Sequence, residues 1–147
     1  MDVLKYPYSK VQIWFYSIAF IAIFIFILVV FIVDFSDHST WPLLGGVFLV
    51  ICALFAYLYR KYFRPLQNGE TALELDSEKL QYFIGNKTVY WKDVLYTNFG
   101  ALKNGGAEIR FALANGIEVI IITRYVAGND NEIYKNITAY FEKYKSV

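Results

Sequence analysis

Two long, uncharged and largely apolar segments near the start of the chain constrain its fold most strongly. They cover residues 11–33 and 41–59. At about 1.5 Å of helix per residue they reach roughly 35 Å and roughly 28 Å, and the hydrocarbon core of a bilayer is about 30 Å thick. Both segments are therefore predicted to be transmembrane helices that form a hairpin, joined by a short loop at residues 34–40.

Two other interpretations of the first segment are less favourable. A secretory signal peptide would also begin with basic residues, but its apolar region is shorter and ends in small residues, which residues 34–38 do not provide. A buried hairpin in a soluble protein would require a chain of 147 residues to cover two helices that are apolar on every side. We therefore expect a retained membrane anchor.

The distribution of charge predicts how the hairpin is oriented. The loop at 34–40 holds acidic residues and His38, whereas the basic residues near the spans all lie outside the hairpin: Lys5, Lys10, Arg60, Lys61 and Arg64. Because Lys and Arg near span ends resist translocation, both termini are predicted to be cytoplasmic and the loop extracytoplasmic. Residues 1–10 then form an N-terminal segment and 60–70 a basic juxtamembrane linker. The same five basic residues are the candidate contacts to the membrane surface.

The residue types that most catalytic and metal sites require are scarce. Cys52 is the only cysteine and lies in the second span, and His38 is the only histidine. The net charge is +1, and basic residues after residue 65 alternate with acidic ones instead of forming a stripe. We predict a protein that is not an enzyme, binds no cofactor or metal, has no internal disulfide and does not bind nucleic acid.

From residue 71 to residue 123 the pattern is that of β-strands. Leu73 and Leu75 alternate with acidic residues, and the alternation continues through Leu80 and Tyr82. A type I′ hairpin turn is predicted at Asn115-Gly116. About five or six antiparallel strands are expected, with the third running from residue 87 to residue 96.

The end of the chain has helical periodicity. Asn129 is the expected N-cap, with Glu132 completing a capping box. The apolar side chains that repeat at helical spacing are Ile133, Ile137, Tyr140, Phe141 and Tyr144. The expected fold of residues 71–147 is therefore α+β, an antiparallel sheet or small barrel closed by a C-terminal amphipathic helix.

This organisation resembles that of small bacterial membrane proteins in which a two-helix hairpin precedes a pleckstrin-homology-like (PH-like) domain. Three segments carry the resemblance: Tyr6-Pro7-Tyr8-Ser9-Lys10, Ala72-Leu73-Glu74-Leu75 and Tyr90-Trp91-Lys92-Asp93-Val94. A pattern of Trp, any residue, Asp and then Ile or Val recurs in such proteins, so the resemblance implies structural roles for Trp91 and Asp93. It also implies a PH-like fold and a location in the bacterial inner membrane, but no ligand.

The function expected from these features is that of a membrane-tethered protein-binding module. Its partners would be the lipid bilayer and an unidentified protein, and a second copy of the chain is a further candidate. Four aromatic residues are the candidate partner contacts, although they could instead fill the core: Tyr90, Tyr96, Phe99 and Tyr125. The alternative function is bacteriocin or toxin immunity, because small two-span proteins with this type of domain resemble some immunity proteins.

Overall fold

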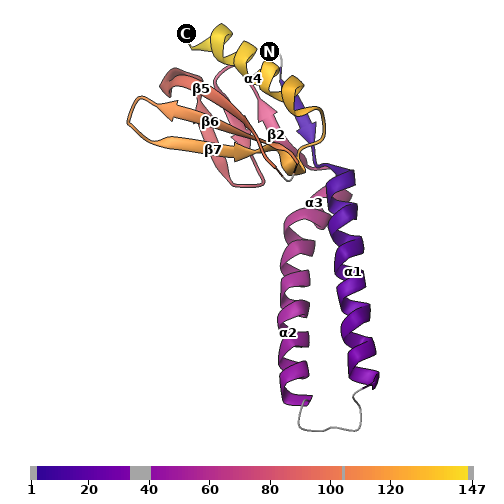
Figure 1. Ribbon diagram of the computed structural model, residues 1–147. Coiled ribbons are helices and arrows are strands. Elements are labelled where there is room, and N and C mark those ends of the chain that lie inside the picture. The colour runs from indigo at the N-terminus through magenta and orange to yellow at the C-terminus, as the bar shows by residue number, and fades with distance from the viewer. Residues whose placement is uncertain (1–2, 34–40, 104, 146–147) are drawn as a thin grey trace. The chain divides into compact units, whose positions relative to one another are not determined.

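The computed structural model describes residues 3–33, 41–103 and 105–145 (Figure 1). The chain divides into two compact units. One is Val11–Arg64, and the other joins the residues before Val11 to those after Arg64. The N-terminal segment therefore belongs to the same unit as the C-terminal half of the chain, a grouping that the sequence analysis did not anticipate. The predicted loop at 34–40, with His38, lies outside the described residues.

The helical unit contains the two predicted apolar helices, α1 (Lys10–Val33) and α2 (Trp41–Leu58). Both are long and apolar enough to cross a membrane. They contact each other through aromatic rings, with centroids 5.2 Å apart for Phe20 and Phe55 and 5.7 Å apart for Phe24 and Phe48. Most other side chains of the two helices point outward, as expected for helices that lipid surrounds.

The segment after α2 is helical as far as Gln67, although the sequence analysis describes residues 60–70 as a linker. A π-helical turn, η1 (Tyr59–Phe63), leads directly into the short helix α3 (Arg64–Gln67). Within this turn the Arg64 N–H donates to the carbonyl of Tyr59, five residues earlier. Pro65 has no N–H, and its ring would clash with the carbonyl four residues earlier in a regular α-helix, so the wider turn accommodates it.

The first sheet of the other unit has four antiparallel strands. In spatial order they are β1 (Leu4–Pro7), β2 (Thr71–Leu75), β3 (Lys79–Tyr82) and β4 (Lys87–Tyr90). Strand β1 pairs with β2, so that Tyr6 is opposite Leu73 although the whole helical hairpin separates them in sequence. The inward-facing side chains of Leu73, Leu75, Leu80 and Val89 are buried, as the alternation predicts.

A second sheet follows a sharp corner. The expected third strand through residue 96 is wrong, because residues Trp91–Asp93 form a 3-10 turn, η2, between β4 and β5. The second sheet has the order β5-β6-β7, and its elements and the short helix after it are β5 (Val94–Ala101), β6 (Ala107–Leu113), β7 (Glu118–Ile122) and η3 (Thr123–Tyr125). With β1, the two sheets contain one strand before the hairpin and six after it, and the six agree with the expected number.

The turn between β6 and β7 differs from the predicted type I′ turn. Gly116 has a φ of +80°, but among the described residues the only non-glycine with positive φ is Asn86. The Gly116 N–H donates to Leu113, and the Leu113 N–H donates to Ile117. Asn115 uses its side chain to accept from the Ile117 N–H at 3.0 Å, which favours negative φ at Asn115. The result is a type I turn with a glycine bulge.

The predicted C-terminal helix is confirmed as α4 (Asp130–Tyr144), which lies over the strands in Figure 1. Its N-cap is Asn129, whose side chain accepts from the Asn131 N–H at 2.9 Å. Ile133, Ile137 and Phe141 are fully or nearly fully buried. Helical spacing places these three side chains on one face, and that face closes the core of the α+β unit.

Candidate functional site

The described part of the chain contains no cluster of three or more His, Cys, Asp or Glu side chains that could hold a metal ion. The thiol of Cys52 is free and exposed on α2. Candidate sites are therefore surfaces of the two units, and each sequence-predicted residue can be placed on one of them.

The five predicted membrane-surface residues have different environments. Lys5 lies on β1 and forms an ion pair with Glu74 on β2, with 3.1 Å between Nζ and Oε2. Lys61 donates to the hydroxyl of Tyr57 at 3.0 Å, and its ammonium lies 5.4 Å from the centre of that ring. Three of the five side chains are exposed at the ends of the helices: Lys10, Arg60 and Arg64.

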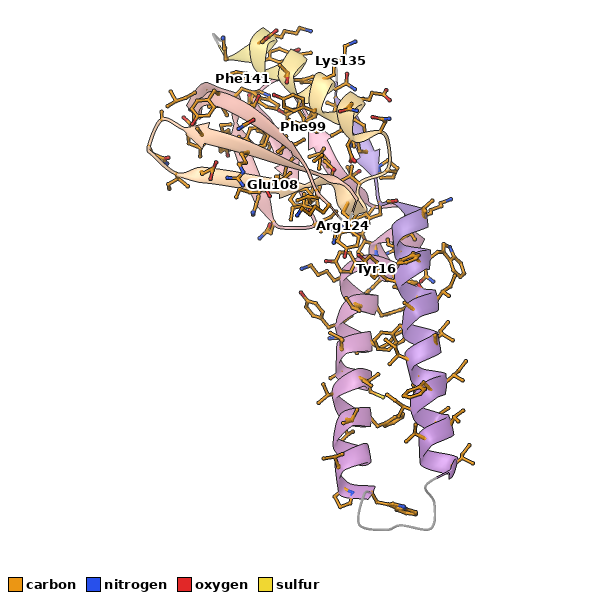
Figure 2. The ribbon with its side chains drawn as sticks, viewed as in Figure 1. Tyr16, Phe99, Glu108, Arg124, Lys135 and Phe141 are labelled. Atoms are coloured by element: carbon orange, nitrogen blue, oxygen red, sulfur yellow. The ribbon has the colours of Figure 1, made fainter. Side chains whose placement is uncertain are left out.

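The four predicted partner contacts do not form one site. Tyr90 and Tyr96 are 45% and 62% exposed and lie on either side of the η2 corner. Phe99 is half-buried against Tyr134 of α4, with ring centroids 4.9 Å apart, and Figure 2 shows it between the strands and that helix. Tyr125 is half-buried in η3, where its carbonyl accepts from the Ser9 N–H at 2.8 Å.

Two aliphatic side chains that the sequence analysis missed lie at the same end of the second sheet as Tyr96. Leu95 is 63% exposed because it sits in a bulge of β5, and Ile117 is 57% exposed at the end of the β6–β7 turn. Tyr96 is opposite Ala112 in the ladder, one residue before the start of that turn. We call Tyr90, Leu95, Tyr96 and Ile117 the corner patch. A bulge shifts the alternation by one residue, so the pattern alone could not show that Leu95 faces outward.

Trp91 and Asp93, the first and third residues of the Trp91-Lys92-Asp93-Val94 motif, form the corner itself. The Trp91 ring is buried, and its Nε1–H donates to the carbonyl of Asp76 at 2.8 Å. The Asp93 carbonyl accepts from the Ala114 N–H at 2.8 Å, which connects the corner to the β6–β7 turn. Through these two hydrogen bonds, Trp91 and Asp93 connect the corner to the turns that follow β2 and β6.

A charged hollow of about 300 Å³ lies on the outer face of β5 and β6, above Gly100, which has no side chain to fill it. Glu108 and Arg110 line it and form an ion pair, and Arg110 also lies 3.8 Å from a carboxylate oxygen of Glu118. Both carboxylates thus lie beside the same guanidinium, and the hollow combines charges of both signs.

Strand β1 is held on both of its edges. Beyond its pairing with β2, the carbonyl of Pro7 accepts from the Ala127 N–H at 2.8 Å, and Tyr8 forms an isolated bridge with Val126. The hydroxyl of Tyr6 accepts from the Asn136 side chain of α4 at 2.7 Å. Burial raises the pKa of Tyr6, the charge of Glu132 raises it further, and the Asn136 hydrogen bond partly offsets both effects.

Comparison with known protein families, curated proteins and solved structures finds no match for this chain.

Proposed function

We propose that this chain is a non-enzymatic, two-span protein of the bacterial inner membrane whose α+β unit is a PH-like, membrane-tethered protein-binding module in the cytoplasm. The observation that carries the proposal is the pairing of β1 with β2 across the helical hairpin. The two antiparallel sheets closed by a C-terminal helix support the PH-like assignment.

The β1–β2 pairing bears directly on topology. Strands that share a hydrogen-bond ladder must lie in one compartment, so the chain between Pro7 and Thr71 crosses a bilayer an even number of times or not at all. Two apolar helices in that interval fit two crossings. Cleavage after α1, as for a signal peptide, would separate β1 from its sheet. The excess of Lys and Arg outside the hairpin supports a cytoplasmic location of the shared compartment.

The corner patch is the surface that best suits a protein partner. Exposed aromatic side chains next to aliphatic ones are typical anchors of protein interfaces. The chain leaves the first sheet for the helices at Pro7 and returns to it at Thr71. Tyr90, opposite Lys79, lies at the other end of this sheet.

The test is affinity purification of the tagged full-length protein from membranes in mild detergent. The variant carries Tyr90→Ala and Tyr96→Ala together, and the matched control is Lys135→Ala, an exposed position on α4 labelled in Figure 2. We expect a protein that the unmodified chain and the control retain and the double variant loses. Equal recovery with all three chains would refute the role of the patch. If the retained protein is a toxin, the immunity function gains direct support.

A further inference from the structure

We infer that one end of the α+β unit is a lipid-binding surface that docks on the anionic headgroups of the bilayer. It is the end from which the chain leaves for the helices and to which it returns. This inference rests on the membrane anchoring proposed above and adds a third contact beside the two spans. We call its residues Phe83, Lys103 and Arg124 the proximal face.

The connections between this end of the unit and the helical segments are short. Strand β1 ends at Pro7 and α1 begins at Lys10, while α3 ends at Gln67 and β2 begins at Thr71. Fully extended, these connections reach at most about 11 Å and about 14 Å. The headgroup region adds roughly 5 to 7 Å to each side of the hydrocarbon core. The sheet end that carries Pro7 and Thr71 is therefore held within reach of the headgroups.

An exposed phenylalanine lies at this sheet end. The Phe83 N–H donates to the carbonyl of Ala72 at 3.0 Å, which places Phe83 beside the first residues of β2. The turn at 83–86 is closed by a hydrogen bond from the Asn86 N–H to the Phe83 carbonyl, and the Phe83 side chain is 42% exposed. An apolar ring on a tight turn is costly in water and stable at the boundary between headgroups and acyl chains.

Basic side chains surround the same end. Arg124 belongs to η3, in which the Tyr125 carbonyl binds the N–H of Ser9, the residue directly before α1. Arg124 Nε donates to the Gly105 carbonyl at 3.2 Å, and this bond joins η3 to the β5–β6 turn that carries the exposed Lys103. Gly106 permits the close approach, since a Cβ there would lie 2.9 Å from Arg124 backbone atoms.

The charge of this surface favours anionic lipid. In the described chain, neither Lys103 nor Arg124 forms an ion pair with a carboxylate. Glu70 is an exposed acid near the start of β2, and its carboxylate accepts from the Asn68 side chain at 3.0 Å. Asp130 is a second acid here, since its carboxylate accepts from the hydroxyl of Thr123, the neighbour of Arg124 in η3. With Lys10 included, three basic side chains outnumber these two acids. Each basic residue near an anionic membrane surface raises the equilibrium constant for docking about fivefold.

The experiment measures the depth of single fluorophores in nanodiscs that contain nitroxide-labelled lipid. One label is placed at Phe83→Cys and a matched one at Tyr90→Cys, both in a Cys52→Ser background. The two native side chains are 42% and 45% exposed and lie at opposite ends of the β3–β4 hairpin. A third protein carries the label on native Cys52 in α2 and reports on the span itself.

We expect headgroup-labelled lipid to quench the label at position 83 and to leave the label at position 90 unquenched. Quenching at 83 should increase when phosphatidylglycerol is added to phosphatidylcholine. The change Lys103→Gln with Arg124→Gln should reduce the equilibrium constant for docking about fivefold per residue removed, and Lys135→Gln should leave it unchanged.

Equal quenching at positions 83 and 90 would overturn the inference, and so would quenching at 83 that is insensitive to phosphatidylglycerol and to the two Gln substitutions. The label on Cys52 separates this failure from failure of the anchor. If acyl-chain nitroxide quenches Cys52 but position 83 is not quenched, the anchor stands and the proximal face does not dock. If Cys52 is not quenched either, the proposed membrane anchoring itself is wrong.

Discussion

The helical unit and the α+β unit are stabilised in different ways. In the helices most large apolar side chains point outward, whereas in the α+β unit Leu73, Leu75 and Leu80 have no exposed surface. Helix hydrogen bonds are local, but the bond from Asn136 to Tyr6 joins residues 130 positions apart. The helical unit therefore leaves most of its apolar side chains uncovered by protein, as membrane-spanning helices do, while the α+β unit depends on its own long-range contacts.

The largest expected effect is that of truncating the corner tryptophan. Trp91→Ala removes a buried ring and leaves the Asp76 carbonyl without its indole donor, so it should lower the free energy of unfolding of the α+β unit by about 3 to 5 kcal/mol. Chemical denaturation followed by tyrosine fluorescence measures this loss. The control is Tyr90→Ala, at the exposed neighbour of Trp91, which should change the free energy of unfolding by less than about 0.5 kcal/mol. A similar loss for both would contradict the assignment of the core.

A substitution in the helical unit tests whether the two units unfold independently. Phe26 is 68% exposed on α1. Because lipid, not protein, surrounds that side chain in the proposed membrane orientation, Phe26→Ala should leave the unfolding of the α+β unit unchanged in the same assay. Loss of stability on the scale of Trp91→Ala would show that the two units do not unfold independently.

The next largest effect concerns the glycine beneath η3. Gly106→Ala introduces a Cβ that would lie 2.9 Å from backbone atoms of Arg124, at a φ of +82°. Gly116→Ala is matched to it, since φ there is +80° and nothing lies within 4 Å of the new Cβ. The left-handed conformation alone costs roughly 1 to 2 kcal/mol. Gly106→Ala should therefore destabilise more than Gly116→Ala in denaturant titrations, and equal losses would show that η3 moves away freely.

A smaller effect is expected at the cap of α4. Asn129→Ala removes the acceptor for the Asn131 N–H and should cost about 1 kcal/mol. Thermal unfolding monitored by circular dichroism checks this value. Asn131→Ala keeps that backbone bond and serves as the control. An unchanged midpoint for Asn129→Ala would mean that packing of the buried face, without the cap, holds the first turn.

The smallest effect is a dependence on alkaline pH. The pKa of Tyr6 is raised, mainly by burial, so the folded chain keeps this proton above pH 10 while the unfolded chain loses it near pH 10. The unfolded state then binds fewer protons, and stability falls as pH rises from about 10 towards the folded pKa. Tyr6→Phe should reduce this decline, whereas the exposed Tyr96→Phe should not. Identical slopes for Tyr6→Phe and the unmodified chain would contradict burial of Tyr6.

The candidate surfaces were only partly predictable from sequence. Exposed aromatics were expected, and Tyr90 and Tyr96 are exposed, but Phe99 lies against Tyr134 of α4. The difference depends on which face of β5 meets α4, and the bulge before Tyr96 changes that alternation. Leu95 gave no signal, because an apolar residue in a short strand is ordinarily counted as core. Phe83 alternates with Tyr82, so the pattern already placed it on the outward side, where it is exposed.

Features that repeat at a local period could be predicted from the amino-acid sequence alone. The two apolar helices, the alternation of the early strands and α4 with its Asn129 cap all follow from residues within a few positions of one another. Long-range packing makes Leu4–Pro7 a strand, turns the chain at Trp91 and brings η3 against Gly106. Those features depend on residues far away in the chain, and the pattern of neighbouring residues does not predict such contacts or their free energy.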